Sequence, residues 1–459
     1  MKKSDLVKIH DWLWEIPKSF RQDMRVPARV YSSSEMLDEI IKDRSLDQLV
    51  NVATMPGIEK HALVMPDVHE GYGFPIGGVA AFNLREGVIS PGGIGYDINC
   101  GVRLLKSALK VEEAIGRMPE LAKEIYAAVP SGVGRSGRVK MSAAEFDEIL
   151  SLGAEKAVAL GYGTDKDLEQ IESRGRLPEA DPALVSAQAK GRGRDQLGTM
   201  GAGNHFVEAE MVQEIFDENE ATRLGLFRGQ VVILLHTGSR GLGHQVATDY
   251  IRVMMKAMPR YGISLPDREL ACAPFNSPEG QDYFKAMSAA ANFAWANRQI
   301  MSWEVRNAWR KVLGESGGEL ELLYDVAHNI AKLENDLVVH RKGATRAFPG
   351  QTVIIPGSMG TGSYVLVGEE KSLEESFGST CHGAGRRMSR TQAKREVSGK
   401  ELKLELEKRG IAVAAGSFSG LAEEAPGAYK DIDQVVEVVA QAGIAKKVAR
   451  LKPLAVIKG

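Results

Sequence analysis

The sequence predicts a large composite α+β protein. Short apolar, strand-like runs alternate irregularly with longer helical patterns along its 459 residues, which is typical of α+β folds rather than of regular βαβ units. Glycine-rich or polar segments follow several of the apolar runs. No proline- or serine-rich linker and no internal repeat is visible. We therefore expect one domain over residues 1–459, with residues 110–195 as a helical excursion from its core.

Helices are expected where apolar residues recur at helical spacing and Glu and Lys are frequent. The segment 34–51 is such a helix, with Ser34 as its N-cap. The other predicted helices cover residues 142–160, 283–313, 394–408 and 432–450. Strands are expected at the apolar, β-branched runs 102–109, 206–212, 231–236, 320–326 and 352–356. Two stretches rich in Gly and Arg, 135–138 and 191–194, are predicted to be polar loops.

Composition limits the location and the partners. The chain is 44% hydrophobic and 26% charged with a formal net charge of −2, so it is an ordinary globular chain without a global basic field. A nucleic-acid partner would need local positive charge. Three cysteines give no disulfide framework and fit a reducing compartment. No signal peptide and no membrane-length apolar run is visible, so we expect a cytoplasmic protein without membrane contact.

Metal-ligand residue types gather in the segments that follow apolar runs. His205 lies in GTMGAGNHFVE, His236 in VVILLHTGSRGLGH and His328 in YDVAHN, while Asp97 and Cys100 share GGIGYDINCG. A lone histidine after a strand is more often a hydrogen-bonded core residue, and a lone cysteine a buried thiol. Together these types form the ligand set of transition metals, and a thiolate can bridge two ions. The sequence therefore predicts a two-metal site suited to phosphoryl chemistry, without choosing between Zn²⁺ and Mn²⁺.

Another histidine, His382, lies in the segment CHGAGRR. Its small neighbours and adjacent arginines fit a nucleophile toward phosphorus whose phosphoryl oxygens are held by guanidinium groups. The alternative is that these arginines form only a solvated helix face. The stretch GSMGTG at 357–362 offers backbone N–H groups to a phosphate or a base edge, or forms only a tight turn. Arg192 and Arg240 add positive charge for phosphate contacts.

Seven motifs, taken in order and spacing, resemble RtcB-type RNA ligases. They are MPDVHEGYGFPIGG, GGIGYDINCGVRLL, LGTMGAGNHFVE, HTGSRGLGH, YDVAHN, PGSMGTGSY and CHGAGRR. The resemblance runs from Asp67 to Lys458, and the residues before 50 match less sharply. Ala202 in GAGNHF stands where the family often has Gly or Ser, and it is small enough to keep the loop's close approach. The resemblance implies mixed or antiparallel sheets with surrounding helices.

The resemblance also implies a GTP-dependent RNA ligase with two Mn²⁺ ions per active site. Such enzymes join RNA with a 2′,3′-cyclic phosphate or 3′-phosphate end to RNA with a 5′-hydroxyl end, in tRNA splicing or RNA repair. The cyclic phosphate is opened, and a histidine is guanylylated by GTP. GMP then passes to the RNA 3′-phosphate, and the 5′-hydroxyl displaces it. Some members of the family depend on an activating protein, archease.

Carried over residue by residue, the motifs imply His382 as the guanylylated nucleophile and Asp67 as the carboxylate that orients it. They imply one manganese ion held by Asp97, Cys100 and His205, and a second held by Cys100, His236 and His328. Positions that match the nucleotide site are Asn204 at the α-phosphate, Glu208 at guanine N1 and N2, and His205, Ser358, Ser363, Tyr429 and Lys458. Arg240 and Arg386 match phosphate or RNA contacts, to which the basic character of Arg192 adds a third.

Two other functions remain as alternatives. A binuclear metal-dependent phosphoesterase would use the same ligands with a metal-activated water. It gives no role to a nucleophilic His382 or to a base-binding Glu208. A non-catalytic nucleotide- or RNA-binding module would tolerate the loss of His382 and Cys100, yet the sequence retains both with their surrounding motifs.

Overall fold

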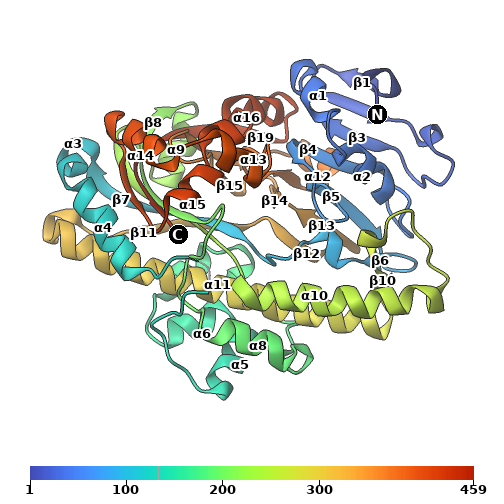
Figure 1. Cartoon of the computed structure of the whole chain (residues 1–459), viewed down its shortest axis with the longest axis horizontal. Coiled ribbons are helices and arrows are strands. Elements are labelled where there is room, and N and C mark those ends of the chain that lie inside the picture. Colours follow the sequence, from blue (N-terminus) through green and yellow to red (C-terminus); the bar gives the residue numbers. More distant parts are fainter. Residues whose placement is uncertain (133) are drawn as a thin grey trace.

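Two large β-sheets form the centre of the molecule (Figure 1). The structure is a computed structural model that describes residues 1–132 and 134–459. In these residues the first sheet has seven strands in the order β1-β2-β3-β4-β5-β13-β12. Their bounds are β1 Val7–His10, β2 Leu13–Ile16, β3 Ala28–Tyr31, β4 Ala62–His69, β5 Ile76–Asn83, β12 Asn329–Glu334 and β13 Leu337–Lys342.

The second sheet has eight strands within the described ranges, in the order β11-β7-β9-β8-β19-β16-β15, with β18 added beside β19. Their bounds are β7 Gly101–Lys110, β8 Phe206–Ile215, β9 Gln230–Thr237, β11 Glu321–Ala327, β15 Thr352–Ile355, β16 Ser363–Gly368, β18 Ala412–Ala415 and β19 Ala445–Lys458. Two short pairs complete the strands, β6 Val88–Ile89 with β10 Ala273–Pro274 and β14 Ala344–Arg346 with β17 Ser379–Cys381.

Most neighbouring strands are antiparallel, whereas β3 with β4 and β18 with β19 are parallel. The sheets are therefore mixed, and helices surround them, which confirms the predicted α+β class. Sequential strands such as β8 and β9 pair directly, as expected where connections are short.

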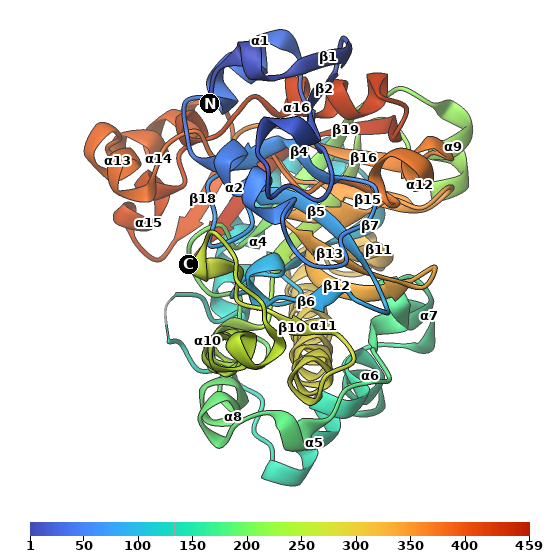
Figure 2. The same ribbon diagram turned by 90° about the vertical axis from the view of Figure 1, so that its right-hand side faces the viewer.

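On one side of the sheets, the helices lie in successive layers. α10 and α11 lie together beneath the strands in Figure 1, and Figure 2 views them end-on with α5, α6 and α8 below. The bounds of the helices are α1 Ser34–Ile40, α2 Ser45–Val52, α3 Val111–Ala114, α4 Met118–Ala128, α5 Ala143–Leu152, α6 Ala154–Ala159, α7 Asp165–Glu169, α8 Ala187–Arg194, α9 Glu218–Leu224, α10 Arg240–Ala257, α11 Pro278–Leu313, α12 Lys371–Ser376, α13 Arg390–Glu396, α14 Gly399–Lys408, α15 Phe418–Glu423 and α16 Ile432–Gln441.

The long helix α11 packs against the helices α4, α5, α6 and α10 and against β9 of the second sheet. Ser277 caps it by accepting a hydrogen bond from the Gly280 N–H, and Pro278 occupies its first turn. It ends where Gly314 adopts a φ of 62°. Its central turns are buried almost all round, so their polar side chains need partners inside the protein. Those partners include loops that border the functional site described below.

Local chain breakers divide three of the predicted helices. The segment 142–160 forms α5 and α6 because Gly153 has a φ of 59° between them. The segment 34–51 forms α1 and α2, and Ser33 rather than Ser34 is the N-cap, since its hydroxyl accepts from the Met36 N–H at 3.2 Å. The segment 394–408 is divided where Ser398 caps α14. Serine side chains favour such helix starts over helix interiors.

Two sequence predictions of secondary structure are wrong. The predicted helix 432–450 ends at Gln441, Gly443 takes a φ of 71°, and the chain then enters β19. The lysines at 446 and 447, which added to the helical pattern, are instead β19 residues paired with β16. The predicted loop 191–194 is the last turn of α8, which Ser186 caps. Tertiary pairing and capping outweigh local composition in both places.

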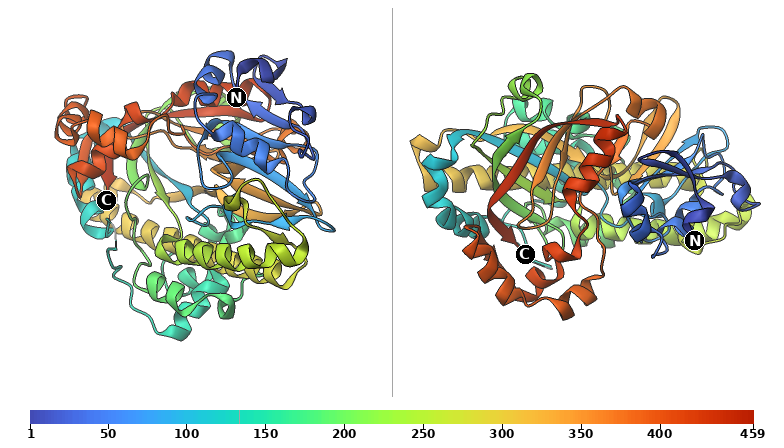
Figure 3. Two further views of the ribbon diagram at one scale, coloured as in Figure 1. Left: turned by 45° about the vertical axis from the view of Figure 1, so that its right-hand side comes forward. Right: turned by 90° about the horizontal axis from the view of Figure 1, so that it is seen from above.

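The N-terminal strands and the C-terminus lie in different halves of the molecule (Figure 3). β19 crosses the second sheet between β8 and β16 and brings Lys458 to its interior. Within the described residues, no helix has both the length and the apolar character that crossing a bilayer requires.

Candidate active site and metal centre

Four adjacent strands of the second sheet deliver the predicted metal ligands to one edge. The antiparallel register of β11, β7, β9 and β8 places the starts of β7 and β8 beside the ends of β9 and β11. Cys100 precedes β7, His205 precedes β8, His236 lies at the end of β9 and His328 follows β11. Antiparallel pairing therefore gathers ligands that are far apart in the sequence.

The ligand atoms form two groups that share one sulfur. Cys100 Sγ lies 3.4 Å from His205 Nε2 and 3.3 Å from His236 Nε2. His236 Nε2 lies 3.2 Å from His328 Nε2, and Asp97 Oδ2 lies 2.8 Å from His205 Nε2. The ligand atoms within each group, Asp97–Cys100–His205 and Cys100–His236–His328, all lie within 4.8 Å of one another.

This donor set fits a pair of transition-metal ions. The Nε2 atoms of His236 and His328 face each other, and neither Nδ1 has a hydrogen-bond partner in the described part of the chain. Two facing nitrogens share at most one hydrogen bond, whereas a bound ion accepts both lone pairs. The His205 ring is oriented by the hydrogen bond between Nδ1 and the Met200 carbonyl at 3.0 Å, as is common for metal-binding imidazoles.

Burial controls the protonation of these groups. It lowers the pKa of His236 and His328 well below the ordinary value, with neighbouring histidines adding to the effect. The neutral ring that results is the form that binds metal. Burial, followed by the charge of Asp97, raises the pKa of the Cys100 thiol. Burial also raises the pKa of Asp97, but the hydrogen bond and charge of His205 outweigh it and hold that carboxyl below its usual range.

His382 lies beside the metal ligands and is held by Asp67. The ring centroids of His382 and His328 are 5.0 Å apart. Asp67, fully buried in β4, accepts at Oδ2 from His382 Nδ1 at 2.6 Å, from the His382 backbone N–H at 2.9 Å and from the Gly383 N–H at 3.3 Å. With the proton on Nδ1, the lone pair of Nε2 is free for chemistry.

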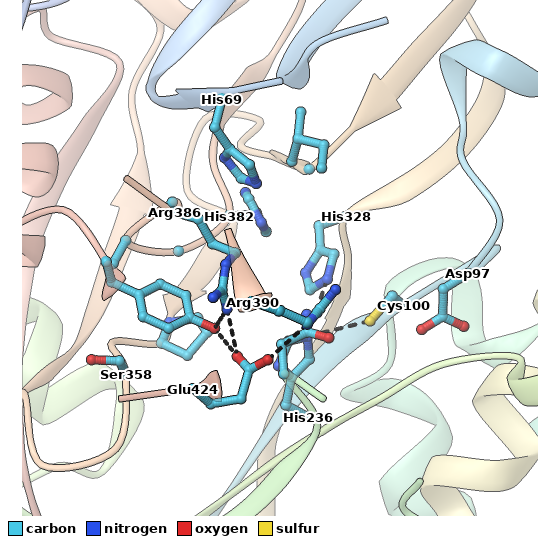
Figure 4. Close-up of a pocket in the computed structure, with 18 of the residues that line it drawn as sticks. His69, Asp97, Cys100, His236, His328, Ser358, His382, Arg386, Arg390 and Glu424 are labelled. Carbon is cyan, nitrogen blue, oxygen red and sulfur yellow. Dashed lines mark hydrogen bonds and ion pairs between the residues drawn. The ribbon is translucent and has the colours of Figure 1, made fainter. Parts of the chain in front are cut away.

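A cavity of about 700 Å³ joins the two features (Figure 4). The sequence-predicted residues that line it are Asp97, Cys100, Asn204, His236, His328, Ser358, His382, Arg386, Tyr429 and Lys458. Metal-type ligands thus share one cavity with a held histidine and with polar groups suited to a nucleotide. Buried sites of this kind combine a few placed polar groups with an enclosed wall.

Other predicted site residues lie behind the cavity wall. Glu208 in β8 and Ser363 at the start of β16 are almost fully buried, and Ser363 donates to Glu210 Oε1 at 2.9 Å. Burial, together with the charge of Glu210, raises the pKa of Glu208 well above its ordinary value. Lys458 reaches the same region and donates to the Gly203 carbonyl at 2.6 Å. His205 and Asp67 also stand behind the residues that line the cavity.

The two arginines predicted outside the CHGAGRR segment differ in position. Arg240 begins α10 with a φ of 54° and donates to Thr199 Oγ1 at 3.3 Å, close to His205. Arg192 lies on α8 and donates to Gln245 Oε1 at 2.9 Å. Neither lines the cavity, and Arg192 is not brought to the metal ligands.

Sequence analysis missed Glu424, a buried carboxylate in the cavity wall. Its Oε2 accepts from Arg386 at 3.0 Å and its Oε1 from Arg390 at 2.9 Å, and the Tyr429 hydroxyl donates to it (Figure 4). Burial raises the pKa of Glu424, but the charges of Lys458 and of both arginines outweigh burial and hold it below 4.5. The only sequence signal was an acidic pair in LAEEAPGAYK, which no motif singles out.

A buried ion pair behind the ligands was also missed. Arg298 in α11 donates to Asp325 at 2.8 and 2.9 Å, and its other nitrogen donates to the carbonyls of Asn99 at 2.7 Å and Thr237 at 3.0 Å. Asn99 precedes Cys100, and Thr237 follows a ligand histidine. The pair therefore ties α11 to two of the loops that carry the metal-type ligands.

Comparison with known proteins agrees with this geometry. The family model described as tRNA-splicing ligase RtcB matches residues 48–459. The tRNA-splicing ligase RtcB of Archaeoglobus fulgidus is 55% identical, with 99% of each chain covered, and that of Thermococcus kodakarensis is 54% identical with the same coverage. The protein of the same name from Pyrobaculum aerophilum is 50% identical over 100% of both chains. The chain, with its shared-cysteine ligand groups and its carboxylate-held histidine, therefore belongs to the RtcB family of tRNA-splicing ligases.

Proposed function

We propose that this protein is a GTP- and manganese-dependent RNA ligase that joins a 3′-phosphate or 2′,3′-cyclic phosphate end to a 5′-hydroxyl end. One observation supports this most. A histidine held at Nδ1 by a buried carboxylate shares a cavity with two metal-type ligand groups. A phosphoesterase that works through a metal-activated water needs the ligands but gives no role to His382 as a nucleophile. The substrates we propose are tRNA halves or damaged RNA with these ends.

In the first step, His382 Nε2 attacks the α-phosphorus of GTP. A nitrogen–phosphorus bond forms, and the bond to the departing pyrophosphate breaks. The ring then carries a positive charge with its proton on Nδ1, next to the Asp67 carboxylate at 2.6 Å. That contact favours the charged ring and keeps Nε2 directed into the cavity.

The remaining reactions use the RNA ends. Any 2′,3′-cyclic phosphate is first opened by water to a 3′-phosphate. An oxygen of the 3′-phosphate attacks the phosphorus on His382, and the nitrogen–phosphorus bond breaks, which returns the neutral ring. The 5′-hydroxyl then attacks the RNA phosphorus, loses its proton, and GMP leaves as the phosphodiester forms. Activation is needed because a phosphate monoester is a poor electrophile without a leaving group.

Manganese held by Asp97, Cys100 and His205 and by Cys100, His236 and His328 would supply positive charge to the phosphoryl oxygens. Around them, Asn204, Ser358 and Lys458 would bind the phosphate and base of the nucleotide, with Glu208 as the acceptor for guanine N1 and N2. A carboxylate acceptor favours guanine because adenine would leave it unpaired. We propose that Arg386 turns from Glu424 to phosphate when RNA binds.

The function is tested by joining two synthetic RNAs in the presence of MnCl₂ and GTP. We expect a product from a 3′-phosphate strand with a 5′-hydroxyl strand, and none from a 3′-hydroxyl strand with a 5′-phosphate strand. His382→Ala should give no product, while His10→Ala, in the exposed strand β1, should join normally. Release of inorganic phosphate from the 3′ end without joining would contradict the proposal and favour the phosphoesterase.

A further inference from the structure

A second cavity, of about 650 Å³, adjoins the active-site cavity. Arg387 and Tyr429 line both. The loop between β15 and β16 separates them, because its residues 356–359 face the first cavity and its residues 360–362 face the second. We call the second cavity the basic groove. The turn after α14, the segment that leads into α16, the start of α16 and the strand β19 supply most of its other walls, and these C-terminal parts are orange to red in Figure 1.

Five basic and two acidic side chains line the basic groove. Some of this charge is already used inside the protein. Arg450 in β19 forms a two-point ion pair with Asp433, at 3.1 and 3.0 Å. Lys430 turns its ammonium to backbone carbonyls, including that of Pro66 at 3.1 Å. Neither Arg450 nor Lys430 is exposed, so these two residues shape the wall rather than attract a ligand.

The other three cations, Arg387, Arg409 and Lys452, are exposed. The Arg387 guanidinium donates to the Gly427 carbonyl, at 2.9 Å. Arg409 donates to the Gly360 carbonyl at 2.6 Å, and its one carboxylate contact among the described residues is with Glu405, at 4.0 Å. Among the residues that the structure describes, Arg387 and Lys452 take part in no ion pair. In a chain of net charge −2, three such cations around one cavity form a local positive surface suited to phosphate groups.

We propose that the basic groove binds the phosphodiester backbone of the RNA strand that ends in the 3′-phosphate, several nucleotides before that end. This inference rests on the proposed RNA-joining function. The 3′-phosphate must reach His382, so the rest of its strand has to extend from the active-site cavity over the neighbouring surface. Arg387 belongs to the same CHGAGRR segment as His382 and lines both cavities, so the basic groove offers the strand a cationic path that begins close to His382. Backbone contacts of this kind position a strand without reading its sequence.

The test measures the binding of RNA to the whole protein by fluorescence anisotropy, without GTP or metal. The probes are 5′-labelled, 3′-phosphorylated RNAs of 20 and 4 nucleotides, each titrated at several salt concentrations. The groove variant is Arg409→Gln with Lys452→Gln. The matched control is Arg252→Gln with Lys256→Gln, an exposed Arg and Lys on α10 away from both cavities. Lys452→Gln alone is included because the Lys452 side chain forms no ion pair within the described residues, so its loss should not destabilise the fold.

We expect the groove variant to bind the 20-mer about 10- to 30-fold more weakly in 0.1 M salt, with a salt slope reduced by about 1.4, since two phosphate contacts are lost. Binding of the 4-mer, GMP attachment from GTP and the melting temperature should match the wild type. Equal binding of the 20-mer by the groove variant, the control and the wild type would overturn the inference. So would an equal loss with the 4-mer, or a loss of GMP attachment, because the groove would then serve the reacting end or the nucleotide. The two RNA-binding results do not depend on whether the wild type joins RNA.

Discussion

Replacing Asp67 by asparagine probes the support of the proposed nucleophile. The Asp67 carboxylate is fully buried, and its Oδ2 accepts from the His382 ring and from two backbone N–H groups. An asparagine carbonyl oxygen can take the same place and keep the backbone contacts. The change therefore removes the negative charge next to the ring and leaves the shape of the site.

The expected loss follows from one contact. A hydrogen bond to a charged group contributes about 1.5–3 kcal/mol, and Asp67 makes such a bond to His382 Nδ1 at 2.6 Å. Each 1.36 kcal/mol of transition-state free energy is a tenfold change in rate. Asp67→Asn should therefore slow the attachment of GMP roughly 10- to 150-fold, because the carboxylate stabilises the positive ring of the transition state more than the neutral ring of the ground state.

The assay is the single-turnover rate of label transfer from α-labelled GTP to the protein, at saturating GTP and Mn²⁺. Asp336→Asn, at an exposed turn, is the matched control. Metal content and melting temperature should stay near those of the wild type. A rate within twofold of the wild type would refute the role of Asp67 as the partner of a charged ring.

Three further predictions test the surroundings of the site. Cys100→Ala removes the sulfur shared by both ligand groups, so elemental analysis should find fewer than one Mn²⁺ per chain, and two retained ions would contradict a shared ligand. Asp325→Asn leaves Arg103 and Arg298 buried without their carboxylate, which should lower the free energy of unfolding by about 3–5 kcal/mol in chemical denaturation; a change below 1 kcal/mol would contradict this. Burial raises the pKa of Glu210 from 4.5 to about 7, so between these pH values the folded carboxyl holds a proton that the unfolded one has lost. The wild type should thus lose stability relative to Glu210→Gln as the pH rises through that window. A melting temperature that changes equally with pH in both proteins would contradict the raised pKa.

The metal-type ligands were predictable because they follow recognisable strands. Apolar runs identified β7, β8, β9 and β11, and the residue types after each run suggested coordination. Their approach to one point depends on antiparallel register, which a single sequence does not state. The two ligand groups came from the family resemblance, and the structure brings the same atoms together.

Other parts of the site leave no local pattern. Glu424 is in the cavity only because α15 and the following turn fold back over Arg386 and Arg390. Arg298 reads as one residue of a helical segment, yet it is fully buried against Asp325. The basic groove joins residues from β19, the turn after α14 and the CHGAGRR segment, so its charge is visible only after folding. The sequence of β19 was predicted to be helical from its composition, but pairing with β8 and β16 makes it a strand.

The central claim, a covalent guanylyl group on His382, is tested most directly by incubating the protein with Mn²⁺ and α-labelled GTP and then separating it on a denaturing gel. Labelled ATP and the variants His382→Ala and His10→Ala run alongside. The account predicts label on the wild type and on His10→Ala with GTP only, lost in acid as a phosphoramidate is, and no label on His382→Ala. Label that persists on His382→Ala, or its absence from fully metallated wild-type protein, would contradict it.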